Sequence, residues 1–360
     1  MTAPPKLSNA DTPHQTPAHT QAHNPSLQFG RALGALVLLS LVVLLLSVGV
    51  GLDMGLDFWR MASDPAVLQI VQDIRLPRGL GAWLAGALLG LSGTLAQAVF
   101  RNPLADPYLL GSASGATLGV AWSLMPWSTV SAAAGGVLTW GGIFIKLGMT
   151  GAAFVGALGA VLLTVALARG VQHTLRLLLA GVVVGVVLGA LSSLLMLIKP
   201  EALLRMQSFM WGSTTYLDWA DCGLMGVVWV SCLSLAVCLG RPLDALNLGQ
   251  DAAQSLGVPV SRVRAASLVL LSLATATAVA QTGLIAFVGL AAPHMVKRWL
   301  PVASRPWLVL SAVVGGLLLL MADVLSRALI APQELPVGIM TAVLGGGYLL
   351  WLMRRPASLG

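Results

Sequence analysis

The sequence predicts an all-α polytopic membrane protein with about ten transmembrane helices. Of its 360 residues, 57% are apolar and only 9% are charged, whereas soluble domains carry about 25% charged residues. Apolar stretches of about 20 residues, the length that crosses a bilayer, recur along almost the whole chain. The net charge of +7 is spread singly between these stretches. That distribution is typical of membrane orientation signals and argues against a nucleic-acid partner.

The chain opens with a polar segment, 1–30, rich in Pro, Thr, Gln and His. Such a composition cannot bury enough apolar surface to fold alone, so we expect a disordered cytoplasmic tail. Its three histidines, at positions 14, 19 and 23, could bind a metal, but no carboxylate or cysteine completes a site, and we expect a solvated tail with no metal or other cofactor. A transmembrane domain is expected over 31–355, beginning with an uncleaved apolar helix.

Ten apolar stretches are predicted to span the membrane. They are 31–52, 79–100, 108–125, 148–168, 177–198, 220–240, 265–282, 284–299, 306–328 and 336–353. The seventh and eighth are separated only by a turn around Gln281–Gly283. Residues 129–145 are apolar but Gly-rich and interrupted, which leaves a short interfacial or re-entrant piece and an eleventh span as alternatives.

An even number of spans puts both termini on one side of the membrane. If that side is the cytoplasm, thirteen Lys and Arg residues lie inside and seven lie outside. This excess satisfies the positive-inside rule, so we expect both termini to be cytoplasmic.

Small residues indicate where the helices pack closely. Gly181, Gly185 and Gly189 follow one another at four-residue spacing in the fifth span, and the second span is also rich in Gly. Helices in lipid associate where small residues let their backbones approach, so both spans are predicted to pack tightly. The three cysteines, at 222, 232 and 238, are interpreted as small core residues.

The sequence has no ATP site of the P-loop type, because no Lys is followed by Ser or Thr. It also lacks a series of ionisable residues within the spans that could relay protons. No catalytic residue is predicted, and an active transporter would have to draw its energy from another subunit. The alternative is a stand-alone secondary carrier or channel, which should show buried carboxylates or a sodium site at a broken helix.

Two loops carry further information. The prolines of Arg101-Asn-Pro-Leu-Ala-Asp-Pro107 prevent a continuous helix there and predict a fixed elbow with Asn102 at its tip. In the loop 241–264, positions 248, 252, 253 and 256 are apolar and fall on one helical face, and Gly257 with Pro259 ends the pattern. This predicts a short amphipathic helix that binds a partner, with a helix lying on the membrane as the alternative.

These motifs, in their order along the chain, resemble the permease subunits of type II ATP-binding-cassette (ABC) importers. The resemblance runs from about residue 75 to 355. It is carried by Arg75-Leu-Pro-Arg78, Arg101-Asn-Pro-Leu-Ala-Asp-Pro107, Leu177-Leu-Leu-Ala-Gly181, the 248–257 segment, Gly289-Leu-Ala-Ala-Pro-His294 and Glu334-Leu-Pro-Val-Gly338. The connector 124–147 is longer than in the family pattern.

The resemblance implies a homodimer of ten-helix subunits in the lipid of a bacterial inner membrane. Two separate ABC ATPase subunits would bind its cytoplasmic face, and a periplasmic substrate-binding protein would deliver the substrate from the other side. Members of this family import iron–siderophore complexes, haem or cobalamin by alternating access. We expect an iron–siderophore complex first, with haem and cobalamin close behind.

At the outer face, the resemblance assigns Arg75, Arg78 and Arg327 to docking of the substrate-binding protein. Exposed ion pairs of this kind add little affinity but orient the encounter. For Arg327 the alternative is an internal pair with Asp323, one helical turn earlier. For Arg75 and Arg78 the alternative is contact with lipid headgroups.

At the inner face, the resemblance assigns Asn102, Leu104 and Thr174 to a gate. For Thr174 the alternative is a helix N-cap. Coupling to the ATPase is assigned to Leu248, Gly249, Asp251, Ala253, Leu256 and Gly257. Replacing Ala253 or Leu256 by Asp is expected to uncouple the ATPase without unfolding the spans. Pro293 and His294 are interpreted as a break in the eighth span, with haem ligation as the alternative for His294. Met196, Met206 and Met210 are interpreted as packing or interfacial residues, with contact to a haem or corrinoid as the alternative.

Overall fold

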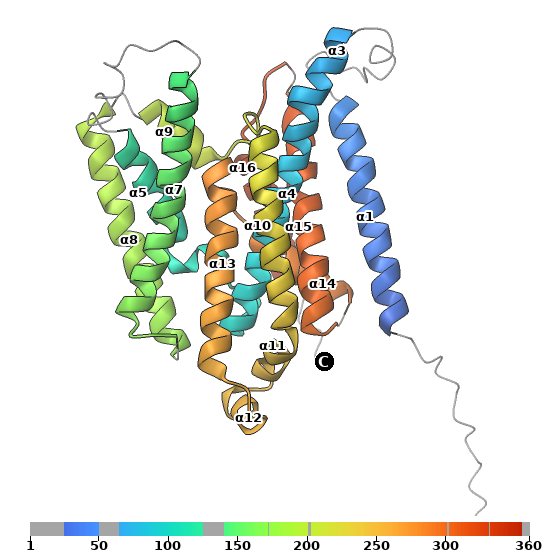
Figure 1. Cartoon of the computed structure of the whole chain (residues 1–360), viewed down its shortest axis with the longest axis vertical. Coiled ribbons are helices and arrows are strands. Elements are labelled where there is room, and N and C mark those ends of the chain that lie inside the picture. Colours follow the sequence, from blue (N-terminus) through green and yellow to red (C-terminus); the bar gives the residue numbers. More distant parts are fainter. Residues whose placement is uncertain are drawn as a thin grey trace, which may run out of the picture.

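A computed structural model describes residues 25–49, 65–124, 140–171, 173–200, 203–300, 302–330 and 332–354. These residues form helices and turns without a β-strand. The long helices run side by side along one axis and build a single bundle (Figure 1). The predicted all-α fold is confirmed.

Each of the ten predicted spans contains one main helix. In chain order they are α1 (Pro25–Gly49), α4 (Leu76–Phe100), α5 (Ser112–Ser123), α7 (Trp140–Leu167), α8 (Thr174–Ile198), α10 (Trp219–Cys238), α13 (Val260–Thr282), α14 (Val288–Trp299), α15 (Ser304–Ala328) and α16 (Val337–Arg354). Among the described residues, seven helical stretches are both long and apolar enough to cross a membrane.

Two of the ten helices are too short to cross a bilayer alone. Helices α5 and α14 have 12 residues each, or about 18 Å at 1.5 Å per residue, against a bilayer core of about 30 Å. Non-helical chain and the 3₁₀ helix η2 (Pro107–Leu110) precede α5, and residues 283–287 precede α14. The Tyr108 hydroxyl donates a hydrogen bond to the Ile285 carbonyl, 3.0 Å away. The irregular segments before both short helices therefore meet inside the bundle.

Helix α4 forms the centre of the bundle, with 94% of its most apolar 18-residue window buried. A side chain on Gly86 or Gly90 would strike the backbone carbonyl of Gly315 or Ser311 in α15. Likewise, a side chain on Gly93 would strike the carbonyl of Gly289 in α14. These glycines let three backbones touch, as the Gly-rich composition of the second span predicted.

The glycine stripe of the fifth span also faces a neighbour. A side chain on Gly181 of α8 would strike the Leu109 carbonyl. Gly185 and Gly189 lie next to Gly111 and Ser114 at ordinary van der Waals distance. The predicted close packing of this span is therefore confirmed, and its partner is the segment that leads into α5.

Several boundaries differ from the prediction. Helix α1 already begins at Pro25, inside the segment expected to be a polar tail, and residues 140–145 belong to α7. The rest of the 129–145 segment lies outside the described residues. Pro293 lies within α14 rather than at a break, because the chain turns earlier, at Gly283, whose φ of +71° favours glycine. Cys222 and Cys232 are buried as expected, but Cys238 is exposed.

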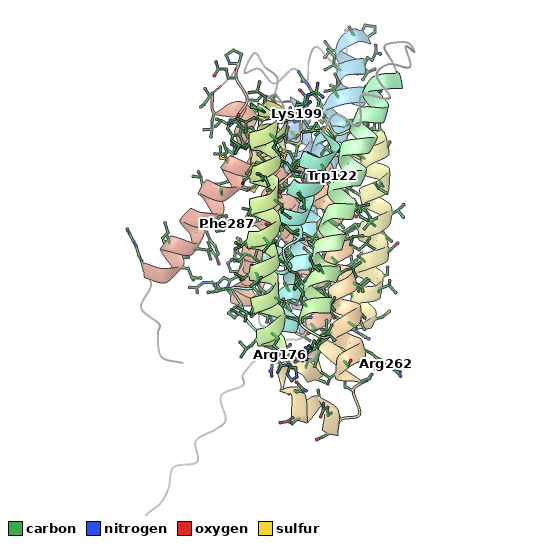
Figure 2. All side chains as sticks on the ribbon, turned by 90° about the vertical axis from the view of Figure 1, so that its left-hand side faces the viewer. Trp122, Arg176, Lys199, Arg262 and Phe287 are labelled. Carbon is green, nitrogen blue, oxygen red and sulfur yellow. The ribbon has the colours of Figure 1, made fainter. Side chains whose placement is uncertain are left out.

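The two ends of the bundle differ in structure (Figure 1). One end, here called the α3 end, carries α3 (Pro65–Ile70), the π-helical turn η1 (Val71–Arg75) and α9 (Leu203–Trp211). The opposite α12 end carries α11 (Gly240–Asn247) and α12 (Gln250–Ser255). Helix α8 spans the distance, with Lys199 toward the α3 end and Arg176 toward the α12 end, and α16 inclines away from the bundle (Figure 2).

Candidate functional site

A network of buried charges lies at the α3 end. Arg78, in the first turn of α4, donates from Nε to Asp323 Oδ1 and from Nη1 to Glu334 Oε1, both at 3.0 Å. Arg327 donates from Nη2 to Asp323 Oδ2 at 2.8 Å. The Asp323 side chain is completely buried, so one carboxylate compensates two guanidinium groups.

Hydrogen bonds extend this network to two further elements. The Thr214 hydroxyl, between α9 and α10, donates to Asp323 Oδ1. Arg327 also donates to the carbonyl and the hydroxyl of Ser47 in α1, at 3.0 and 2.7 Å. The two arginines and the two carboxylates sum to zero formal charge, which favours burial of the whole set. The network thereby fixes α1, α4 and α15 relative to one another.

The three arginines assigned to docking lie at one end, but two of them point inward. Arg78 and Arg327 keep only 8% of their side-chain surface exposed, and Arg75 donates to the Val48 carbonyl of α1 at 3.0 Å. The alternative reading of Arg327, an internal pair with Asp323, is confirmed. Docking through these residues stays a prediction.

The pairing of Arg78 with Glu334 had no sequence signal. Asp323 and Arg327 are four residues apart on one helix, a spacing that places side chains together. Arg78 and Glu334 are separated by 256 positions and meet only because α4 packs against α15. The motif Glu334-Leu-Pro-Val-Gly338 indicates no role for Glu334, and only the folded chain brings Glu334 to Arg78.

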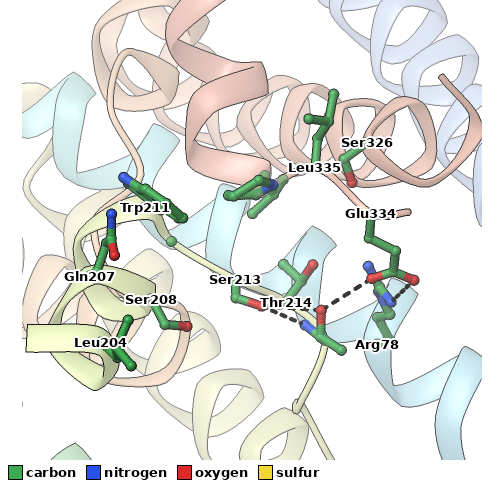
Figure 3. A pocket seen from close by; sticks show the side chains of 14 residues that line it. Arg78, Leu204, Gln207, Ser208, Trp211, Ser213, Thr214, Ser326, Glu334 and Leu335 are labelled. Atoms are coloured by element: carbon green, nitrogen blue, oxygen red, sulfur yellow. Dashed lines mark hydrogen bonds and ion pairs between the residues drawn. The ribbon is translucent and has the colours of Figure 1, made fainter. Parts of the chain in front are cut away.

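A pocket of about 310 Å³ opens beside this network (Figure 3). Arg78 and Glu334 form one side, and α9 contributes Leu204 and Trp211 to another. Much of the remaining wall carries hydroxyl groups. They belong to Ser208, Ser213, Thr214, Thr215 and Ser326. The pocket therefore combines a guanidinium, a carboxylate and several neutral hydrogen-bonding groups.

The elbow predicted from the prolines is present at the end of α4. Arg101 adopts a left-handed conformation with φ of 48° and ends the helix. Asn102 Oδ1 accepts a hydrogen bond from the Leu104 amide at 2.9 Å, and both side chains are exposed. Thr174 is the first residue of α8, and His173 is its N-cap, so the interpretation of Thr174 as the cap is wrong.

The 241–264 loop forms two short helices instead of one. Gly249, with φ of 122°, separates α11 from α12, and Gly257, with φ of 76°, follows α12 as predicted. Leu248 and Leu256 are 72% and 66% exposed, whereas Ala253 is fully buried. The predicted apolar face is therefore divided between the bundle and the solvent. Because Ala253 packs inside, an Asp at this position would disturb folding. Of the two predicted substitutions, only Leu256→Asp therefore tests docking of the ATPase.

The remaining candidate ligands, His294 and the methionines, lie in different surroundings. Among the described residues, no three His, Cys, Asp or Glu side chains gather as a metal site would require. Met206 is fully buried, while Met210 of the same helix is exposed. The His294 ring packs edge-on against Tyr348, with 6.0 Å between the ring centroids, between α14 and α16.

Comparison with known proteins identifies the family. The model of the FecCD transport family matches residues 33–355. The hemin transport system permease protein HmuU of Yersinia pestis is 37% identical over 90% of this chain and 95% of its own length. The vitamin B12 import system permease protein BtuC of Escherichia coli is 34% identical over 93% of this chain and 98% of its own length.

A solved structure supports the same conclusion. A metal-chelate type ABC transporter in an inward-facing conformation superposes with a TM-score of 0.78 at 28% identity, covering 90% of this chain and 99% of that one. The residues matched by the FecCD family model include the network at the α3 end, the elbow and the α11–α12 loop. The chain belongs to the FecCD transport family, and it is a type II ABC importer permease subunit.

Proposed function

We propose that this chain moves a metal chelate from the periplasm to the cytoplasm of a bacterium by alternating access, driven by separate ABC ATPase subunits. The observation that carries the proposal is the two-ended construction of the bundle. A charged network and a pocket lie at the α3 end, and a helical loop with exposed leucines lies at the α12 end. The charged network and pocket suit docking of a binding protein, and the helical loop suits docking of an ATPase.

The α12 end is proposed to face the cytoplasm. Arg176 and Arg262 both lie there (Figure 2), in agreement with the positive-inside rule. Leu248 and Leu256 would fill an apolar groove of the ATPase, and Gly249, Asp251 and Gly257 would shape the loop that carries them. Ala253 would contribute by holding α12 against the bundle.

The α3 end is proposed to dock the substrate-binding protein. Arg75, Arg78 and Arg327 would meet carboxylates of that protein, which requires the two buried arginines to exchange internal partners for external ones.

Asn102 and Leu104 of the exposed elbow, together with Thr174, would close the pathway toward the cytoplasm in the resting state.

A second copy of the chain is proposed to complete the pathway. Helix α8 presents a row of exposed aliphatic side chains, among them Leu179, Val182 and Val186. Helix α16 exposes Val343 and Leu350. Apolar faces of this kind suit burial against a matching subunit in lipid, where close shape complementarity rather than hydrophobicity drives helix association.

The substrate is proposed to be a chelate whose metal is already coordinated. The α8 wall consists of Ala, Gly, Val, Leu and Ser between Leu178 and Ile198, with a single Met near its end. Such a surface offers almost no ligands to a bare ion, whereas selective ion pores carry rings of carbonyl or charged groups. An iron–siderophore complex is our first candidate, and the two named relatives make haem and cobalamin the compounds to compare with it.

Reconstitution tests the proposal. The chain is placed in liposomes with or without its ATPase, and uptake of ferric siderophore, haem and cobalamin is measured with the binding protein outside and ATP inside. We expect uptake of one chelate only when ATPase, ATP and binding protein are all present. Uptake at an equal rate without the ATPase would contradict the proposal and indicate a secondary carrier or channel.

A further inference from the structure

Arg78 is held by two carboxylates of very different character. Asp323 belongs to α15, is completely buried, and uses both oxygens, one for Arg78 and Thr214 and one for Arg327. Glu334 lies in the irregular segment between α15 and α16 and keeps 30% of its side-chain surface exposed. Its second oxygen has only a long contact, 3.4 Å, with the Thr215 hydroxyl. Glu334 is therefore the partner of Arg78 that can be exchanged.

The charge balance requires that any group replacing Glu334 beside Arg78 is also an anion. With Glu334 in place, two guanidinium groups face two carboxylates. If Glu334 withdraws, Asp323 alone remains against two buried cations, a state that costs several kcal/mol unless another anion enters. A carboxylate is the group that restores both the charge and the hydrogen bond to Arg78 Nη1.

The pocket beside Arg78 gives such a group room to enter. Its volume of about 310 Å³ exceeds that of an acidic side chain, and its wall carries the hydroxyl groups of Ser208, Ser213 and Thr215. Figure 3 shows Arg78 and Glu334 side by side at the edge of this pocket. An acidic side chain arriving through the pocket would reach the same guanidinium that Glu334 occupies.

We infer that Glu334 is an internal competitor of the substrate-binding protein: it occupies on Arg78 the position that a carboxylate of that protein takes in the docked complex. The inference rests on the proposed function, which makes the α3 end the docking face. Glu334 keeps the free permease neutral at this face and weakens docking, so that the binding protein can leave after delivery.

The test measures the affinity between the complete permease–ATPase complex in nanodiscs and its purified substrate-binding protein. Glu334→Gln removes the competing charge and keeps the shape. We expect docking to become about three- to fivefold tighter, the range of a partly exposed ion pair. Asp73→Asn is the matched control, since Asp73 is an exposed carboxylate at the same end, and it should change the affinity less than about twofold.

A double-mutant cycle shows whether Glu334 acts through Arg78. Arg78→Gln should weaken docking, and adding Glu334→Gln to it should give no recovery, because the competitor has lost its target. Equal tightening by Glu334→Gln with and without Arg78 would overturn the inference and indicate a general charge effect. Thermal unfolding of each complex confirms that the variants are folded.

The outcomes separate this inference from the proposed function. Weaker docking of Arg78→Gln without tightening by Glu334→Gln overturns the competition and leaves docking at the α3 end intact. Unchanged docking in both variants overturns docking through Arg78 as well. If Glu334→Gln does not fold, Glu334→Asp serves instead. Its shorter side chain keeps the charge but withdraws it from Arg78, so tighter docking supports the competition and unchanged or weaker docking overturns it.

Discussion

At the residue scale, Asp323 is the group on which the α3 end depends. It accepts from Arg78, Arg327 and Thr214 with no exposed surface of its own. If Asp323 were removed, the two guanidinium groups would be left with one carboxylate, that of Glu334. Of the two arginines, Glu334 contacts only Arg78. Arg327 would then keep only the Ser47 carbonyl and hydroxyl and its own helix as acceptors.

Replacing Asp323 by Ala should therefore destabilise the folded protein. The expected loss is about 3–5 kcal/mol, the range measured when one member of a buried ion pair is removed. Thermal unfolding of the purified protein in detergent measures it. Asp73→Ala, at an exposed site of the same end, is the control and should leave the melting temperature nearly unchanged. Equal melting temperatures for the two variants would show that the network carries no stability.

At the element scale, close helix contacts and short loops decide the arrangement. Helix α4 touches α15 and α14 through glycines 86, 90 and 93, and α8 touches the segment before α5 through Gly181. Helices α11 and α12 are separated by Gly249, whose backbone conformation excludes most side chains. Small residues thus fix both the core and the loop at the α12 end.

Gly93→Ala tests the contact between α4 and α14. The added methyl group would strike the Gly289 carbonyl, and overpacking of this kind costs about 1–3 kcal/mol. We expect a lower melting temperature. Gly223→Ala in α10 is the matched control, because nothing lies within 4 Å of the added atom and Ala is the better helix former. A decrease of the same size in both variants would contradict the packing argument.

Leu256→Asp tests the loop at the α12 end. Leu256 is 66% exposed, so a charge there should leave the bundle folded and abolish co-purification of the ATPase, because a carboxylate would have to be buried in the interface. Ile330→Asp, at an apolar position that is 51% exposed near the end of α15, should leave co-purification unchanged. Retention of the ATPase by Leu256→Asp would remove α12 from the coupling surface.

Sequence patterns predicted the elements better than their contacts. Hydropathy located the apolar stretches that contain the ten main helices, because the length of an apolar run is set by the bilayer. It did not separate α13 from α14, and that division is inferred from the turn around Gln281–Gly283. It did not predict that α5 and α14 are short, since the chain before each is also apolar and differs only in backbone conformation, as at Phe287 with φ of 68°. Spacing found the pair of Asp323 with Arg327, but the pair of Arg78 with Glu334 depends on tertiary packing.

At the scale of the whole molecule, the bundle joins two unlike ends through continuous helices. Helix α15 carries Asp323 and Arg327 near its end, and its first residue, Ser304, donates its amide to Asp244 of α11 at 2.8 Å. A single helix thus connects the charged network to the loop proposed to bind the ATPase. Movement of α11 by the ATPase would reach the α3 end through α15, as alternating access requires.

Labelling of the two ends from outside the cell tests the central claim most directly. In spheroplasts of a strain whose permease lacks its native cysteines, Gln72→Cys places a thiol at the α3 end and Ser255→Cys places one on α12, both at exposed positions. A membrane-impermeant maleimide should label position 72 in intact spheroplasts and position 255 only after lysis. Labelling of position 255 in intact spheroplasts would put α12 outside the cell and contradict ATP-driven import by this chain.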